Sequence, residues 1–255
     1  MLEEKKLGLS FRQKIKQNKL CIGTFLTLPC PEIAEICAEA GMDWVLVDLE
    51  HTTLDVKDVQ SILQVINRKC ACIVRVPSKE ETTIKRVLDT GVDGIMVPHV
   101  NTAEETMSIV QACLYPPEGK RSVGIARAQK YGLGFKDYLD KSNEEILIIP
   151  QVEHIQGVDG IDEIAHVPGI SAVFIGPYDL SGSMGMLGEV KSPQVQGNIN
   201  KVFRSCSKAG IPVGIFCADV GSAFPYVEQG FILIALGLDS RFLIDSVRRV
   251  IDQLG

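Results

Sequence analysis

Eight short apolar runs, separated by segments of helical periodicity, constrain the fold of this 255-residue chain more than any other feature. The runs are rich in Val and Ile and almost uninterrupted in their apolarity, which is typical of strands buried on both faces. We therefore expect eight strands in a parallel sheet. Their predicted positions are Cys21–Leu26, Trp44–Leu49, Ala71–Val76, Gly94–Val97, Ile146–Val152, Ala172–Ile175, Pro212–Phe216 and Ile232–Leu236.

The segments between these strands carry the start and stop signals of helices. Ser78 with Glu81, and Asn101 with Glu104, have the spacing of helix N-termini. A glycine ends a helical pattern just before four of the strands, as helix C-caps do. These glycines are Gly41, Gly91, Gly210 and Gly230. The alternation predicts an α/β protein with one domain, a (β/α)8 TIM barrel over residues 1–255.

An open, doubly wound sheet is the alternative fold, but no GxGxxG sequence follows the first strand. Gly119-Lys120 resembles the end of a phosphate-binding loop, whereas Leu114 stands where that loop requires glycine. The longest stretch without a regular pattern runs from Tyr115 to about Ser142. We expect it to be a functional loop, because long loops in compact domains usually are.

The net charge of −6 and the isoelectric point of about 5.3 argue against nucleic acid as a partner. No apolar run approaches the roughly 20 residues that cross a bilayer. The charged amino terminus lacks the apolar core of a secretion signal. We therefore expect a cytoplasmic protein with no membrane partner. Eight cysteines without a CxxC pair predict buried free thiols, not disulfides or a zinc cluster.

Polar residues gather where the predicted strands end, which is the face of a barrel that holds catalytic groups. They are Asp48, Glu50 and His51 after the second strand, Arg75 at the end of the third, Gln151 and Glu153 at the end of the fifth, and Gly176–Asp179 after the sixth. Acidic groups that end apolar strands are costly to bury unless they are paired or hold a cation. We therefore predict an active site at this face.

Several of these residues have two interpretations. Glu153 and Asp179 either form salt bridges with Arg75 and Arg121 or hold a divalent cation, for which hard carboxylate ligands favour Mg²⁺ or Mn²⁺. His51 is either a general base or a histidine at a loop start. Arg75 either neutralises the acidic groups or stabilises a developing oxyanion.

The remaining histidines and the absent nucleophiles narrow the chemistry. His99 is evenly balanced between a structural and a functional role, whereas we expect structural roles for His154 and His166. None of the predicted strands contains the lysine that a Schiff-base aldolase requires. The GxSxG elbow of serine hydrolases is also absent.

In these segments the chain resembles the metal-dependent pyruvate aldolases of the HpcH/HpaI family. That family includes 2,4-dihydroxyhept-2-ene-1,7-dioate aldolase and the 2-keto-3-deoxy sugar acid aldolases. The resemblance rests on an ordered set of segments from about residue 20 to residue 240. They are VDLEHTTLD, IVRVP, RVLDTGVDGIMVPHV, YPPEGKRSVG, QVEHIQGVDGIDEIAHVPGISAVFIGPYDLSGSMG and ALGLD.

The resemblance implies reversible aldol cleavage of a 2-keto-4-hydroxy acid into pyruvate and an aldehyde. It implies that Glu153 and Asp179 hold Mg²⁺ or Mn²⁺, with Co²⁺ as a further candidate. The cation would stabilise an enolate and so replace the missing lysine. Arg75 would steady the enolate oxygen, and His51, paired with Asp89, would act as acid and base.

The resemblance also implies how the pocket is lined. Gln151 and the turn of Gly176, Pro177, Tyr178 and Asp179 would surround pyruvate. Phe25 would form an apolar wall, and Asp48 and Glu50 would orient His51 and metal-bound water. Tyr178 departs from the family, which often has a small residue at this position, so we expect a narrower aldehyde pocket.

The resemblance further implies a homohexamer in which the last helix, about residues 239–255, packs against a neighbouring subunit. Two alternatives remain open at this point. One is a related enolate-forming lyase that cleaves acyl-CoA thioesters or decarboxylates oxaloacetate, and the other is a non-catalytic barrel that binds a small acid. A CoA enzyme would need a basic mouth, for which the chain offers Lys120, Arg121, Arg127 and Lys130.

Overall fold

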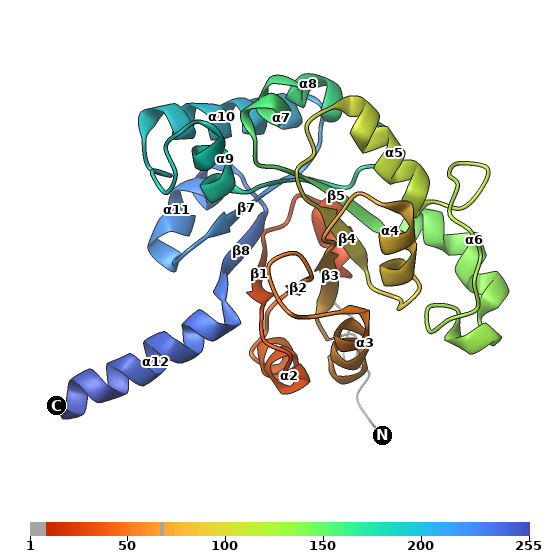
Figure 1. The fold of residues 1–255 in the computed structure, drawn as a ribbon, viewed down its shortest axis with the longest axis horizontal. Helices are drawn as coiled ribbons and strands as arrows, with labels where there is room; N and C mark the ends of the chain where they lie inside the picture. The colour runs from red at the N-terminus through yellow and green to blue at the C-terminus, as the bar shows by residue number, and fades with distance from the viewer. Residues whose placement is uncertain (1–8, 67–68) are drawn as a thin grey trace.

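The computed structural model describes residues 9–66 and 69–255, and within them eight parallel strands close into a barrel in chain order (Figure 1). Each strand pairs with the next, and the last pairs with the first. The strands are β1 (Cys21–Leu26), β2 (Trp44–Asp48), β3 (Ala71–Arg75), β4 (Gly94–Val97), β5 (Leu147–Val152), β6 (Val173–Ile175), β7 (Val213–Cys217) and β8 (Leu233–Leu238). The predicted (β/α)8 TIM barrel is confirmed, with strand ends that differ by one or two residues.

Helices follow the strands and surround the barrel (Figure 1). They are α1 (Phe11–Lys16), α2 (Pro31–Glu39), α3 (Val56–Val65), α4 (Glu81–Leu88), α5 (Ala103–Cys113), the 3₁₀ turn η1 (Lys130–Gly132), α6 (Phe135–Glu145), α7 (Ile155–Asp159), α8 (Ile161–Ile164), α9 (Pro177–Ser183), α10 (Pro193–Lys208), α11 (Val220–Gln229) and α12 (Asp239–Leu254). Unlike the others, α12 projects away from the barrel (Figure 1).

The two predicted helix starts are wrong by one or two residues. Helix α4 begins after Glu80, and Ser78 only accepts a weak bond from the Glu80 N–H at 3.4 Å. Helix α5 is capped by Thr102, whose hydroxyl accepts from the Glu105 N–H. Asn101 instead donates its backbone N–H to the Glu105 carboxylate. The predicted stops are confirmed, since the four glycines all have positive φ.

The segment from Tyr115 to Ser142 is more regular than predicted. It contains η1 and most of α6, which runs on to Glu145. Helix α6 buries only Ser142, so its sequence lacks the apolar stripe by which a helix is recognised. The segment is anchored by Arg121, which is fully buried between the rings of Tyr115 and Tyr138.

The core has two shells, because alternate residues of each strand point to opposite faces. One shell fills the inside of the barrel with Trp44, Leu46, Ile73, Ile149 and Phe174 among others. The other packs the outward residues against the helices. The inward-facing positions also supply the site. On β2, Asp48 points inward like Trp44 and Leu46. On β3 and β5, Arg75 and Gln151 point inward like Ile73 and Ile149.

All eight cysteines are free, and seven of them are buried, as predicted. Burial raises the pKa of the Cys113 thiol to about 12, as it does for Cys70, Cys206 and Cys217. Across residues 9–66 and 69–255, no helix combines the length and the apolarity needed to span a membrane.

Candidate active site

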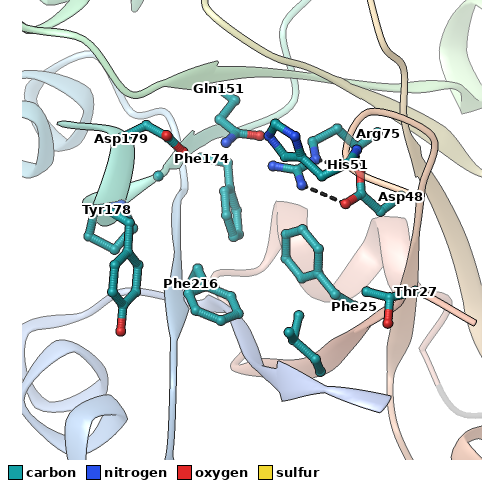
Figure 2. A pocket seen from close by; sticks show the side chains of 13 residues that line it. Phe25, Thr27, Asp48, His51, Arg75, Gln151, Phe174, Tyr178, Asp179 and Phe216 are labelled. Atoms are coloured by element: carbon teal, nitrogen blue, oxygen red, sulfur yellow. Dashed lines mark hydrogen bonds and ion pairs between the residues drawn. The ribbon is translucent and has the colours of Figure 1, made fainter. Parts of the chain in front are cut away.

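A cavity of about 250 Å³ opens where the strands end (Figure 2). Most of the polar side chains gather on one side of it, and the other side is mainly aromatic, with Thr27 beside Phe25 (Figure 2). The polar residues are Thr27, Asp48, His51, Arg75, Gln151 and Asp179, and the others are Phe25, Phe174, Gly176, Pro177, Tyr178, Phe216 and Leu238. The structure therefore brings most of the predicted site residues to one place.

A buried ion pair fixes the guanidinium of Arg75 at the cavity. Its Nε and Nη2 donate to the two carboxylate oxygens of Asp48 at 2.9 and 2.7 Å. Its Nε also lies 3.3 Å from Glu50 Oε2, and its Cζ lies 5.0 Å from the centre of the Phe25 ring. Burial alone would lower the pKa of Arg75, but hydrogen bonding to Asp48 and the charges of Asp48 and Glu50 raise it overall. The guanidinium is therefore a permanent, preorganised cation.

Asp48 also shapes the loop that carries His51. Its Oδ1 accepts the backbone N–H of Glu50 at 3.0 Å and lies 3.4 Å from that of His51. The imidazole of His51 is mostly exposed and lies at the cavity, with Nε2 3.6 Å from Glu50 Oε2. Burial raises the pKa of Glu50, partly offset by Arg75 and the nearby histidines. The loop thus offers a proton-transfer group beside a fixed cation.

Glu153 is a buried carboxylate directly behind the cavity wall and is only 2% exposed. Its Oε1 accepts the backbone N–H of His99 at 2.8 Å, and its Oε2 accepts from the amide of Gln151. Burial, together with the charges of Asp179 and Glu50, raises the pKa of Glu153, against the hydrogen bond from His99. Of the two interpretations of Glu153, the salt bridge to arginine does not form, because Arg75 pairs with Asp48 and Glu50, and Arg121 pairs with Asp89.

Gly176 allows the Glu153 carboxylate to lie where it does. A Cβ at this position would stand 2.6 Å from Glu153 Oε2 and 2.9 Å from Gln151 Nε2, so only glycine fits. Asp179, exposed at the cavity, lies in the first turn of α9, which begins directly after Gly176. The short β6–α9 junction therefore brings the second predicted carboxylate to the same wall.

The donor set fits a hard divalent cation. The charge of Asp179 contributes to the raised pKa of Glu153, and the buried Gln151 Oε1 has no hydrogen-bond partner among the described residues. Within that part of the chain, no group of three or more His, Cys, Asp or Glu side chains is arranged to hold a metal ion. A cation here would take two protein carboxylates and leave its other positions to water and substrate, as oxygen-seeking Mg²⁺ does.

The predicted pairing of His51 with Asp89 does not form within one chain. Asp89 caps the C-terminus of α4, and the chain continues from there to the start of β4. Its Oδ1 binds Arg121 Nη2 at 2.7 Å, and it is not among the cavity residues. A residue that ends a barrel helix lies toward the amino ends of the strands, on the face opposite the site.

The sequence left two residues of the site unassigned. His99 lies between Glu153 and Glu50, and its position directly after β4 was the only signal for it. Phe216 packs edge-on against Phe25 and Tyr178, at ring-centre distances of 5.5 and 6.1 Å. Its inward position on β7 could have identified it. His154 and His166 make local backbone contacts, at Gln156 and Asp162, in keeping with structural roles.

Comparisons with known proteins identify the family. The model described as HpcH/HpaI aldolase/citrate lyase matches residues 21–246. The chain is 38% identical over 236 residues to the 4-hydroxy-2-oxovalerate aldolase of Rhodococcus jostii, covering 92% of this chain and 91% of the relative. It is 40% identical over 245 residues to the hydroxypyruvate/pyruvate aldolase of Deinococcus radiodurans, covering 95% and 88%.

A solved structure agrees with these relatives over the whole barrel. The crystal structure of an HpcH/HpaI aldolase/citrate lyase family protein from Burkholderia cenocepacia has a TM-score of 0.92 to this chain, at 34% identity. The match covers 96% of this chain and 98% of the other. The chain therefore belongs to the HpcH/HpaI aldolase/citrate lyase family.

Proposed function

We propose that this aldolase cleaves a 2-keto-4-hydroxy acid reversibly into pyruvate and an aldehyde, with the help of a divalent cation, Mg²⁺ or Mn²⁺. Its relatives are named as aldolases, and their names include 4-hydroxy-2-oxovalerate, hydroxypyruvate and pyruvate. The observation that carries the proposal is the buried Glu153 carboxylate. No arginine or lysine of the described chain forms a salt bridge with it, and it lies beside Asp179 at a cavity that holds a fixed arginine.

Glu153 and Asp179 would hold the cation, which would supply Lewis-acid stabilisation of the negative charge on the keto oxygen. The N–H groups of Arg75 that are not bonded to Asp48 would point toward the same keto oxygen. Because Asp48 locks the guanidinium in advance, little reorganisation is needed as charge develops. Gln151 and Gly176 would set the depth at which the three-carbon acid lies.

His51 is the residue placed to move a proton. In the cleavage direction it would take the proton of the 4-hydroxyl group, directly or through one water molecule, and in synthesis it would return that proton. Glu50 lies 3.6 Å from its Nε2 and would stabilise the protonated ring. The exposed imidazole can exchange its proton with solvent between turnovers.

The aldehyde would lie against the aromatic side of the cavity. Phe25, Phe216 and Tyr178 form this wall, and the bulk of Tyr178 would narrow it. The acyl-CoA alternative is not favoured, because two of its four basic candidates are engaged internally. Arg121 is buried against Asp89, and Arg127 donates to the carbonyls of Thr90 and Leu63.

We also propose that the protein is a homo-oligomer, a hexamer by resemblance, in which α12 packs on a neighbouring subunit. Seven large apolar side chains of α12 are exposed: Phe242, Leu243, Ile244, Val247, Val250, Ile251 and Leu254. Ile36 of α2 and Phe224 of α11 are also exposed. Helix α11 precedes β8 and α2 follows β1, so both lie near the place where α12 leaves the barrel. Light scattering should give a multiple of 27.9 kDa, and Val247→Glu with Ile251→Glu should reduce it.

A screen of aldehydes with pyruvate and added Mn²⁺ or Mg²⁺, read as product formation, tests the proposed reaction. We expect turnover that is abolished by a chelator and restored by either cation. Full activity in the chelated protein would contradict the proposed use of a metal. Exchange of the pyruvate methyl protons with deuterated water, without any aldehyde, would separate enolate formation from the choice of acceptor.

A further inference from the structure

His99 occupies an unusual place in the backbone. It is the second residue after β4, and its φ of 53° lies in the left-handed region that favours glycine. This conformation points its N–H at Glu153 Oε1, 2.8 Å away, while the next N–H, of Val100, binds the carbonyl of Gln151 at 3.1 Å. Two successive N–H groups of the β4–α5 loop therefore donate hydrogen bonds to residues at the end of β5.

The imidazole of His99 lies between two carboxylates. Nδ1 is 3.4 Å from Glu153 Oε1, and Nε2 is 3.4 Å from Glu50 Oε1. A neutral imidazole carries one N–H, so in either tautomer a ring donor faces one of these carboxylates. Glu50 in turn touches Arg75 and His51. The ring is thus the link between Glu153 and the cluster of Glu50, Arg75 and His51.

A glycine would adopt this backbone at least as readily, so the backbone alone does not explain a histidine at this position. The ring is also not needed to fill space, because 56% of the side chain is exposed. What the imidazole adds is its contact with two carboxylates. Groups that orient a metal-binding carboxylate in this way tune how well the site holds its ion.

We propose that His99 is a positioning residue of the cation site. Its backbone N–H fixes one oxygen of Glu153, and its ring holds Glu153 and Glu50 at a set separation. This inference rests on the proposed function, because it takes Glu153 as a ligand of the divalent cation. His99 itself contacts neither the cation nor the substrate; it acts through the two carboxylates.

Two substitutions separate the contacts of the ring. His99→Gly removes the ring and suits the left-handed backbone. His99→Asn also tolerates that backbone, and its amide reaches the place of Nδ1 but not that of Nε2, so it keeps the contact with Glu153 and loses the one with Glu50. His166→Asn removes an imidazole that hydrogen-bonds the Asp162 carbonyl, outside the site, and serves as the control.

The test is titration of the purified full chain with Mn²⁺ in the absence of substrate, with free Mn²⁺ read by electron paramagnetic resonance. We expect His99→Gly to weaken Mn²⁺ binding about tenfold. We expect His99→Asn to stay within about threefold of wild type, yet to lose turnover at saturating Mn²⁺ because Glu50 is no longer tied to Glu153. His166→Asn should match wild type. Thermal unfolding of the metal-free variants checks that each is folded.

Wild-type affinity in folded His99→Gly would overturn the proposal while leaving the cation site intact. Equal weakening in His99→Asn and His99→Gly would overturn the assigned contact between Nδ1 and Glu153. If wild type itself does not bind Mn²⁺, the proposed function fails and the role of His99 fails with it. The three results are distinguishable in one titration series.

Discussion

Two arginine–aspartate pairs with buried guanidinium groups, at opposite places in the barrel, show how position separates chemistry from stability. Arg75 pairs with Asp48, and Arg121 pairs with Asp89, each at 2.7 Å, and each guanidinium also lies against an aromatic ring. Arg75 stands at the cavity, among acidic groups that outnumber it. Arg121 is enclosed by Tyr115 and Tyr138 and lines no cavity at the strand ends.

The difference lies in the charges of the groups around each arginine. Around Arg75, the carboxylates of Glu50 and Glu153 remain incompletely neutralised, and burial raises the pKa of both. Around Arg121, the hydroxyl of Tyr138 and the carboxylate of Asp89 compensate the charge, and they raise the arginine's pKa against the effect of burial. The excess negative charge around Arg75 favours binding of a cationic ligand, whereas the compensated charges around Arg121 stabilise the fold.

The largest effect is expected from Glu153→Gln. Removing the charge should lower kcat/KM with Mn²⁺ by about 10³-fold, as loss of a key electrostatic group does. The metal-free protein should be as stable as wild type or more stable, because a buried carboxylate of raised pKa has been neutralised. Steady-state kinetics and metal-free thermal unfolding measure the two. A destabilised variant would mean that Glu153 serves the fold, as Asp89 does.

Asp89→Asn should have the opposite profile. It leaves the fully buried Arg121 with a weakened partner and should cost about 3 kcal/mol of unfolding free energy. Urea unfolding measures this loss, and kcat of the folded variant should be unchanged. A folded variant that is stable but inactive would break the comparison. It would mean that a neighbouring subunit brings Asp89 to the His51 of another copy.

Gly176→Ala and Gly124→Ala are a matched pair of substitutions, one beside Glu153 at the cavity and one beside Asp89, the partner of Arg121. A Cβ at Gly176 would overlap Glu153 Oε2 at 2.6 Å, whereas one at Gly124 would make ordinary contact with Asp89 Oδ2 at 3.5 Å. We expect Gly176→Ala to lower kcat/KM about 10²-fold through misplaced carboxylate geometry, and Gly124→Ala to be silent. Equal effects of the two changes would remove the distinction between the regions.

The smallest effect is expected from Tyr138→Phe. Its hydroxyl accepts from Nη1 and Nη2 of Arg121, both at 3.3 Å. Loss of these long hydrogen bonds should lower the unfolding free energy by about 1 kcal/mol and leave kcat unchanged. Chemical denaturation of the variant beside wild type resolves a change of this size. An increase in stability would show that the hydroxyl does not compensate the buried charge.

The sequence predicted the barrel and most of the site for one physical reason. Strand periodicity places Asp48, Arg75 and Gln151 in the inward rows, and the carboxyl ends of the strands gather them. The pairing of Asp89 with His51 came from the resemblance, and it does not form within one chain because Asp89 ends a helix and binds Arg121. The role of His99 depends on a left-handed φ, which no pattern of residue types reveals for a histidine.

The central claim is that Glu153 and Asp179 share one divalent cation, and crystallography with Mn²⁺ tests it most directly. Crystals grown with Mn²⁺ and pyruvate should show one anomalous peak in the cavity, about 2.1 Å from a carboxylate oxygen of each residue. Pyruvate should reach the same ion beside Arg75. A peak bound by only one of the two carboxylates, or a cavity that holds pyruvate without the ion, would contradict the account.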